Sequence, residues 1–199
     1  MLYIMLPKII AVCGYKRSGK DTIAKYLNKK YNYKHLKITY KLKECLKLLF
    51  DLRDHELETD KKEKINKKWN VTPRKLMQFI GTEIFQYKIQ EILPDIDKKF
   101  WIKTFLTDSL VNNLRNKKDF HIVISDIRFI HEYEELKKLN IPISIIKVTN
   151  DNIMIDSNEE LHISEREFIK IPYDKEILNN SSFDDMYKKI DEYIININK

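Results

Sequence analysis

Residues 8–22 read KIIAVCGYKRSGKDT, and this stretch decides the fold. Its first six residues are nearly all apolar, which predicts a strand buried on both faces of a parallel sheet. From residue 20 onward, Ile23, Ala24 and Leu27 recur at helical spacing. A strand, a loop bounded by glycines and a helix form the opening of a βαβ unit. The sequence therefore predicts an α/β fold in which helices flank a parallel sheet.

The loop between this strand and helix fits the pattern Gly-x4-Gly-Lys of a phosphate-binding loop, or P-loop. Glycines let the backbone curl so that N–H groups point at phosphate oxygens, and the helix N-terminus adds partial positive charge. The Lys20 ammonium would then reach the β- and γ-phosphates. The alternative is an ordinary turn with a surface lysine. The residues expected to bind the nucleotide are Gly14, Arg17, Ser18, Gly19, Lys20, Asp21 and Thr22.

One position departs from the usual P-loop pattern. The Ser or Thr whose hydroxyl ligates Mg²⁺ directly after the lysine is Asp21 here, and Thr22 follows one place later. Nucleoside monophosphate kinases often show a similarly displaced hydroxyl, so the shift favours a small-molecule kinase. Which group contacts the metal stays open between Thr22 and Asp126, directly or through water.

Glycine is scarce in this chain. Average usage near 7 % would give roughly fourteen glycines in a chain of this length, and there are three. Two of these glycines, Gly14 and Gly19, lie at the two ends of the loop. The third, Gly81, lies inside a predicted helix, where glycine costs about 1 kcal/mol against alanine. Either a ligand or another helix is expected to approach Gly81 closely.

The remaining pattern predicts one domain over residues 1–199 with alternating strands and helices. A proline-capped helix is expected to begin at Thr72-Pro73. The other predicted elements are strands near 35–38, 121–125 and 143–148, helices over 42–49, 97–115 and 132–139, a loop or mobile insertion over 51–70, and an extended segment from 173 followed by a helix from Ser182.

Composition excludes several classes of protein. No apolar run approaches 18 residues, so no membrane span is expected. The segment Met1–Pro7 lacks the features of a secretory signal, and Cys13 and Cys45 are too few for a disulfide framework, which favours a reducing, cytoplasmic setting. The net charge of +7 comes mostly from dispersed lysines among acidic neighbours, so nucleic-acid binding is disfavoured.

Several blocks together resemble the bacteriophage-type deoxynucleoside monophosphate kinases of the P-loop superfamily. They occur in the family's order and cover most of the chain from 9 to 195. The blocks are the loop 14–22, TPRKLMQFIGTE at 72–83, WIK at 101–103, SDIR at 125–128, HE at 131–132 and HISE at 162–165. The resemblance implies transfer of the ATP γ-phosphoryl group to a deoxynucleoside 5′-monophosphate, with Mg²⁺, and a helical substrate-binding region over about 39–115.

The resemblance places acceptor-binding residues on the helix after Thr72 and at the next block. Arg74 sits in the first helical turn, where a cation opposes the macrodipole unless it meets an anion. A monophosphate would supply that anion, and an arginine turned into water is the alternative. Gln78 lies one turn further on and would reach a base edge. The resemblance also places Gly81 and Trp101 near the substrate, although packing explains either residue equally well.

Other blocks supply candidates at the end of the second strand. Asp126 ends an apolar strand, as a Walker B acid does, and would orient Mg²⁺, its waters or the substrate. Arg128 would add positive charge for the acceptor or the transferring phosphoryl group. Glu132 would accept a hydrogen bond from the sugar or base, or simply cap a helix. The expected catalytic residues are Lys20, Lys16, Arg128 and Asp126, with Lys16 also binding substrate.

The segment 150–172 corresponds to the lid of nucleotide kinases, which excludes water from the reacting group. There Arg166 and Lys170 would contact ATP phosphates, His162 would orient Glu165 or cap an element, and residues 179–182 would lie near the adenine ring. A homodimer is left open.

Two other functions remain as alternatives. One is a P-loop kinase with another acceptor, such as phosphomevalonate kinase of the animal type or dephospho-coenzyme A kinase. The other is a non-catalytic nucleotide- or nucleic-acid-binding module, which the lack of clustered arginines and aromatic ribbons disfavours.

Overall fold

The computed structural model describes residues 7–110, 120–153 and 161–197. The chain divides into two compact units, one formed by Met1–Lys37 with Ser109–Lys199 and the other by Ile38–Asp108. Each unit is described by itself below.

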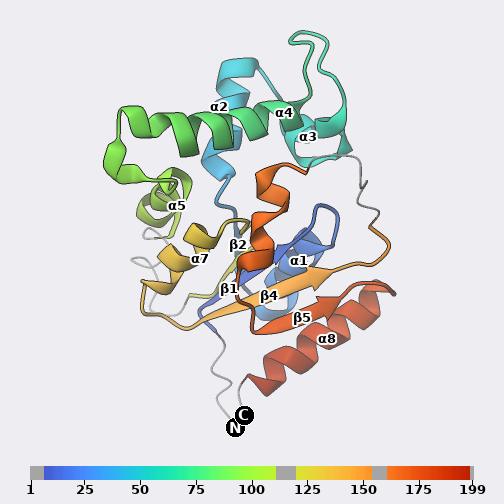
Figure 1. Ribbon diagram of the computed structural model, residues 1–199. Helices are drawn as coiled ribbons and strands as arrows, with labels where there is room; N and C mark the ends of the chain where they lie inside the picture. Colours follow the sequence, from blue (N-terminus) through green and yellow to red (C-terminus); the bar gives the residue numbers. More distant parts are fainter. Residues whose placement is uncertain (1–6, 111–119, 154–160, 198–199) are drawn as a thin grey trace. The chain divides into compact units, whose positions relative to one another are not determined.

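The first unit is built on a five-stranded sheet in which every strand pair is parallel (Figure 1). The strand order is β2-β3-β1-β4-β5. The strands are β1 (Ile9–Gly14), β2 (Lys34–Leu36), β3 (Ile122–Ile124), β4 (Ile143–Thr149) and β5 (Lys175–Leu178). Ile9 pairs with Ile122 on one side and Ile143 on the other, and all of β1 is buried. The expected central strand of a parallel sheet is confirmed.

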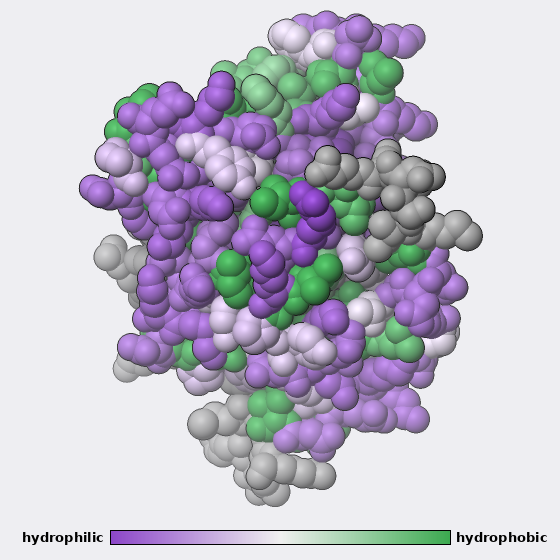
Figure 2. Space-filling view, viewed as in Figure 1, coloured by the Kyte–Doolittle hydropathy of each residue, from purple (hydrophilic) through white to green (hydrophobic). Residues whose placement is uncertain are grey.

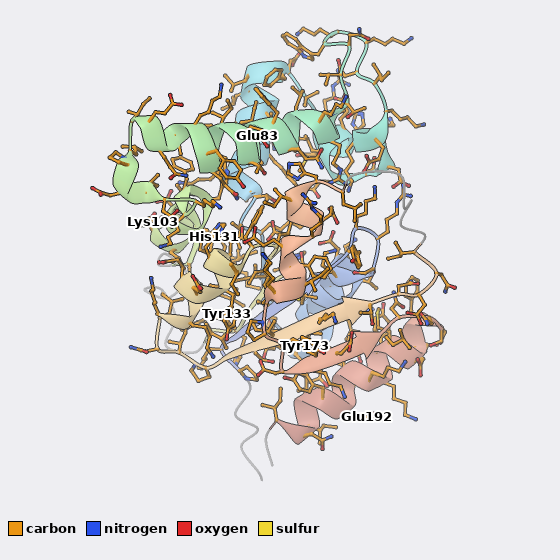
Figure 3. The ribbon with its side chains drawn as sticks, viewed as in Figure 1. Glu83, Lys103, His131, Tyr133, Tyr173 and Glu192 are labelled. Carbon is orange, nitrogen blue, oxygen red and sulfur yellow. The ribbon has the colours of Figure 1, made fainter. Side chains whose placement is uncertain are left out.

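Helices of the first unit pack on this sheet through apolar faces. They are α1 (Lys20–Tyr31), α7 (Ile130–Lys137) and α8 (Phe183–Asn196), with short 3-10 turns η6 (Ile163–Glu165) and η7 (Glu167–Lys170). The N-terminus of α8 is capped by Ser182, whose side chain accepts the Asp185 N–H. Met186 and Ile190 of α8 join the core beneath the sheet, while Glu192 lies on the exposed side of the helix (Figure 3).

The described part of the second unit is helical, as expected for most of this region. Its elements are α2 (Tyr40–Phe50), α3 (Asp54–Glu58), η1 (Asp60–Glu63), α4 (Pro73–Gln78), the π-helix η2 (Phe79–Tyr87), η3 (Lys88–Glu91), η4 (Pro94–Ile96) and α5 (Phe100–Thr104), after which the π-helix η5 (Phe105–Leu110) runs across the unit boundary. Thr72 caps α4 by accepting the Lys75 N–H at 3.1 Å, and Pro73 occupies the first turn. The predicted start of this helix is correct.

Two predicted elements of the second unit differ from the structure. The stretch 51–70 is not a plain loop, because it contains α3 and η1 and is held by Asn66, whose side chain donates to Glu56 and whose backbone pairs with Val71. The helix expected over 97–115 begins at Phe100 and changes to π geometry at Phe105. The predicted inward position of Leu114 lies outside the described residues.

The face drawn in Figure 2 is mostly hydrophilic, with apolar residues in small separate groups. In the part of the chain that the structure describes, no helix has both the length and the apolar character needed to cross a bilayer.

Candidate active site

The loop after β1 has the backbone geometry of a phosphate cradle. Gly14 and Gly19 adopt φ angles of 146° and 108°, which side-chain-bearing residues rarely reach. The Ser18 N–H donates to the Tyr15 carbonyl at 3.2 Å and closes the loop. A Cβ on Gly14 would lie 2.3 Å from the Val148 carbonyl oxygen of the neighbouring strand β4. The first glycine is therefore required both by its own conformation and by the sheet beside it.

The Lys20 side chain folds over this loop. Its Nζ donates to the Gly14 carbonyl at 2.9 Å and to the Tyr15 carbonyl, which leaves one of its three N–H groups for an anion. Lys20 is 8 % exposed. Burial, assisted by the nearby Arg128 guanidinium, lowers the pKa of Lys20 to about 8. An incoming phosphate would favour the charged form further by placing a negative charge beside it.

A residue from β5's end supports the second half of the loop. Asn179 Nδ2 donates to the Ser18 carbonyl at 2.9 Å and lies where a Cβ on Gly19 would approach within 2.6 Å. Ser18 Oγ is buried and has no hydrogen-bond partner among the described residues. Arg17, by contrast, is exposed. Asn179 thus braces the loop, a role different from the adenine contact expected for 179–182.

The carboxylate of Asp21 belongs to a network at the carboxyl edge of the sheet. Asp21 Oδ1 accepts the Ser125 hydroxyl at 2.7 Å and lies 3.3 Å from Lys37 Nζ. His35 Nε2 lies 2.7 Å from the same Ser125 oxygen. Although partial burial opposes ionisation, Lys37 and the Ser125 hydroxyl lower the pKa of Asp21 to about 2. Asp21 is therefore a fixed negative charge beside the loop.

Asp126 and Thr22, the two predicted metal ligands, flank this network. Both side chains are partly buried, Asp126 directly after Ser125 and Thr22 in the first turn of α1. Because β3 is hydrogen-bonded beside β1, its end lies at the same edge of the sheet as the loop. Their positions agree with the expectation, and their roles as ligands stay predictions.

Arg128 and Glu132 meet at the start of α7. Glu132 Oε2 accepts the backbone N–H groups of Arg128 at 2.7 Å and Phe129 at 3.1 Å. Glu132 is 4 % exposed, and burial raises its pKa to about 8 in spite of these two donors. One carboxylate oxygen is thus used to cap α7, which is the alternative to substrate binding. The Arg128 guanidinium instead binds Glu165 and the Ser164 carbonyl.

Within the expected lid, the side chains divide into two groups. Glu165 is buried and accepts the Lys16 backbone N–H at 3.0 Å, while His162 caps η6 by accepting the Ser164 N–H. Arg166 and Lys170 are exposed. The Lys16 side chain is exposed as well, so its backbone rather than its ammonium is held in place.

In the second unit, Arg74 forms an ion pair with a neighbouring acid. Its Nε and Nη2 donate to Glu63 Oε1 at 3.0 and 2.8 Å. Glu63 lies at the end of η1, within the stretch that was expected to be a loop. The pairing offsets the unfavourable position of a cation at the N-terminus of α4, so Arg74 is neither turned into water nor lacking an anion.

Gly81 and Trp101 pack together in the interior of the second unit. A Cβ on Gly81 would lie 2.8 Å from Leu42 Cδ2 of α2, so another helix approaches this glycine. Trp101 Nε1 donates to the Gly81 carbonyl at 2.7 Å, and its ring, 6 % exposed, packs against Phe85 and Phe100. Packing therefore accounts for both residues, and base stacking on Trp101 stays a prediction that its burial disfavours. Gln78 is half-buried at the end of α4.

Comparison with known proteins identifies the family. The family model described as deoxynucleotide monophosphate kinase matches residues 8–62 and 49–190. The chain belongs to the deoxynucleotide monophosphate kinase family. It is 30 % identical over 189 residues to a protein called putative deoxynucleotide monophosphate kinase from Acanthamoeba polyphaga mimivirus, covering 92 % of this chain and 93 % of the relative. Membership makes the chain a nucleoside monophosphate kinase.

A more distant relative and a solved structure also match the chain. The deoxynucleotide monophosphate kinase of Escherichia phage RB69 is 24 % identical over 72 % of this chain, which spans 52 % of that relative's length. The crystal structure of a gluconokinase from Sinorhizobium meliloti aligns with a TM-score of 0.50 at 7 % identity, over 97 % of this chain and 94 % of that one. The latter likeness concerns the fold alone.

Several residues that support or surround the phosphate loop were not predicted in that role. They are His35, Lys37, Ser125, Glu165 and Asn179. Ser125 and Glu165 stand inside blocks that carry the family resemblance, so a signal for them existed. Lys37 and Asn179 directly follow strands β2 and β5, whose carboxyl ends meet the loop, a position that favours function in parallel sheets, and His35 lies within β2.

Proposed function

We propose that this kinase transfers the γ-phosphoryl group of ATP to deoxynucleoside 5′-monophosphates and so supplies DNA precursors. A phosphate oxygen of the acceptor attacks the γ-phosphorus in line, the bond to the β-phosphate oxygen breaks, and ADP and a deoxynucleoside diphosphate leave. The observation that carries the proposal is the cradle of Gly14, Gly19 and buried Lys20, held next to Arg128 in a chain of this family. It supports binding of a polyphosphate whose charge must be neutralised.

The residues at the loop fit Mg²⁺ as the partner of ATP. Asp21 and Asp126 offer carboxylates, and Thr22 and Ser125 offer hydroxyls, so the donor set is made of the oxygen ligands that this cation prefers. Asp21 and Ser125, with Thr22 and Asp126 beside them, would hold the ion directly or through its waters. When bound, Mg²⁺ would supply positive charge that offsets the negative charge of the phosphates during transfer.

The protein's own contribution would be positioning and charge neutralisation. Lys20 would bind the β- and γ-phosphates, and Lys16, Arg17 and Arg128 would add positive charge around the transferring group. Arg74 would exchange Glu63 for the acceptor's phosphate, which suits the bidentate fork of arginine. The acceptor phosphate is already nucleophilic, so no covalent enzyme intermediate is required.

A coupled ADP-release assay tests this function. The panel contains deoxy- and ribonucleoside monophosphates together with phosphomevalonate and dephospho-coenzyme A, and the Lys20→Met variant is the matched control. We expect turnover with at least one deoxynucleoside monophosphate and a loss of several orders of magnitude in the variant. Absence of turnover with every monophosphate, combined with tight DNA binding, would identify a nucleic-acid-binding module instead. We further propose a cytoplasmic location, supported by two cysteines that are both free.

A further inference from the structure

Glu165 links the phosphate loop to Arg128. It lies at the end of η6 and is 5 % exposed. Its Oε2 accepts the Lys16 backbone N–H at 3.0 Å, and its Oε1 accepts Arg128 Nη1. The adjacent Ser164 carbonyl accepts the same Nη1 at 3.2 Å. A single buried carboxylate therefore binds a loop amide with one oxygen and a guanidinium with the other.

A second, apolar contact fixes the same segment on the loop. The rings of Tyr15 and Phe168 meet edge to face with centroids 4.8 Å apart. Phe168 is 1 % exposed, on the 3-10 turn that follows Glu165. Aromatic pairs of this geometry stabilise a contact beyond what the burial of their area contributes. The Tyr15–Phe168 contact thus holds this segment against the loop independently of Glu165. The Glu165 carboxylate can therefore serve a purpose other than holding the segment in place.

The charges around Glu165 indicate what that role is. Arg128 and Lys20 are close enough for the guanidinium to lower the pKa of Lys20, and Glu165 opposes this effect. Although burial disfavours its ionised form, Arg128 and the Lys16 N–H lower the pKa of Glu165. An ionised Glu165 therefore offsets the repulsion between two cations that would otherwise move apart.

Arg128 keeps an unused edge in this arrangement. Both of its side-chain hydrogen bonds within the described residues are made by Nη1, to Glu165 and to the Ser164 carbonyl. Among the described residues, its Nε and Nη2 have no hydrogen-bond partner. These two nitrogens form the edge of a guanidinium that binds phosphate in a bidentate manner. The guanidinium is fixed on one side and remains able to bind an anion on the other.

We infer that Glu165 is a positioning residue, which holds Arg128 beside Lys20 so that its Nε and Nη2 edge binds the transferring phosphoryl group. The inference deepens the proposed kinase function and rests on it. The competing explanation is that Glu165 occupies the place of a nucleotide phosphate and must be displaced. The two explanations predict opposite effects when the negative charge is removed.

The main test compares Glu165→Gln with the wild type and with the matched control Glu167→Gln, an acid of the adjacent turn η7. We expect Glu165→Gln to lower kcat about 10- to 100-fold, since misplacing a catalytic group by 1 Å costs that much. The KM for ATP should change less than about threefold, because the loop and Lys20 remain. Glu167→Gln should match the wild type. Unchanged or raised kcat in Glu165→Gln would overturn the inference.

A double-mutant cycle separates positioning from a structural role. In an Arg128→Ala background, adding Glu165→Gln should lower kcat less than about threefold further, because Glu165 acts through Arg128. If the two losses instead multiply, Glu165 acts independently and the inference fails. Should Glu165→Gln not fold, Glu165→Asp serves in its place, since it keeps the charge but is too short to reach both partners.

Binding of inorganic tripolyphosphate, measured by calorimetry, tests the inference without turnover. Positioning by Glu165 predicts binding within about threefold of the wild type in Glu165→Gln, because the loop and Lys20 remain, whereas competition predicts clearly tighter binding and overturns the inference. This measurement needs no acceptor, so it separates the inference from the proposed kinase reaction. If the wild type binds tripolyphosphate but phosphorylates no monophosphate, the proposed reaction fails while the inference about Glu165 is still tested.

Discussion

Ser125 Oγ donates a hydrogen bond to Asp21 Oδ1 at 2.7 Å. In P-loop NTPases the hydroxyl follows the loop lysine and the acid ends a neighbouring strand. Here an acid, Asp21, follows Lys20, and a hydroxyl, Ser125, directly follows β3 ahead of Asp126, so the residue types at positions 21 and 125 are exchanged while Asp126 remains as an acid at the end of the strand. Because the Ser125 proton goes to Asp21, His35 Nε2 must donate to Ser125 and carries a hydrogen.

The exchange predicts that a reciprocal swap restores function. Asp21→Ser removes the ionised carboxylate and should weaken Mn²⁺ binding, Ser125→Asp places two mutually repelling carboxylates in contact, and each change alone should lower kcat at least about tenfold. The double variant recreates the usual arrangement and should recover most of both losses. Mn²⁺ binding in the presence of ADP, followed by electron paramagnetic resonance, gives a readout independent of turnover. A double variant no better than the worse single variant contradicts the exchange.

The glycines of the loop and of the second unit should differ in their tolerance of a methyl group. Gly14→Ala forces a Cβ against the Val148 backbone at a φ of 146°, so we expect at least about 2 kcal/mol lower unfolding free energy. In Gly81→Ala the Cβ meets the end of the Leu42 side chain, which can rotate, and helix propensity improves. The change should stay within about 1 kcal/mol. Urea denaturation of both variants measures the contrast, and equal losses would contradict it.

The elements around the phosphate loop were predictable because their signals are local. An apolar run, two glycines and a helical repeat stand within 24 residues of one another in β1, the loop and α1. The Asp21–Ser125 pair was not predictable in this way, since its members are 104 residues apart. Parallel pairing of β1 with β3 brings them together, and that register follows from packing rather than from either segment alone.

The carboxylate that binds Arg74 escaped prediction for a different reason. Glu63 lies in a charge-rich stretch without apolar periodicity, where one acid among several carries no distinguishing signal.

The π geometry of η2 was missed because an apolar pattern over nine residues fits an α-helix equally well. Tertiary contacts, such as the Trp101 hydrogen bond to the Gly81 carbonyl, accompany the altered winding.

Arg74 should affect the acceptor and not the donor. Lysine keeps the charge but lacks the paired Nε and Nη2 donors that now bind Glu63. Arg74→Lys should therefore raise the KM for the deoxynucleoside monophosphate about tenfold or more. The KM for ATP should be unchanged. Steady-state kinetics with each substrate varied in turn checks this split, and Lys75→Arg on the exposed side of α4 is the control. Parallel changes in both KM values would argue for general disruption.

Glu132 should make the stability of the protein fall as pH rises from about 5 to 8. Burial raises the pKa of this carboxyl from 4.5 to about 8 in the folded protein. Between these values the folded state holds a proton that the unfolded state has lost, so raising the pH favours unfolding. One such proton corresponds to a slope of about 1.4 kcal/mol per pH unit. Above about pH 8 both states are ionised and this contribution becomes constant.

Replacing Glu132 with glutamine tests that assignment directly. The amide oxygen of Glu132→Gln still accepts the Arg128 and Phe129 N–H groups, but the side chain cannot ionise. The urea midpoint of unfolding should therefore change less between pH 5 and 8 in the variant than in the wild type. At pH 8 the variant should be more stable than the wild type. Glu134→Gln, an exposed acid on the same helix, should keep the wild-type slope. If Glu132→Gln keeps the full slope of unfolding free energy against pH, the proton resides on another group. If the variant is less stable than the wild type by the same amount at every pH, Glu132 acts as an ionised cap of α7.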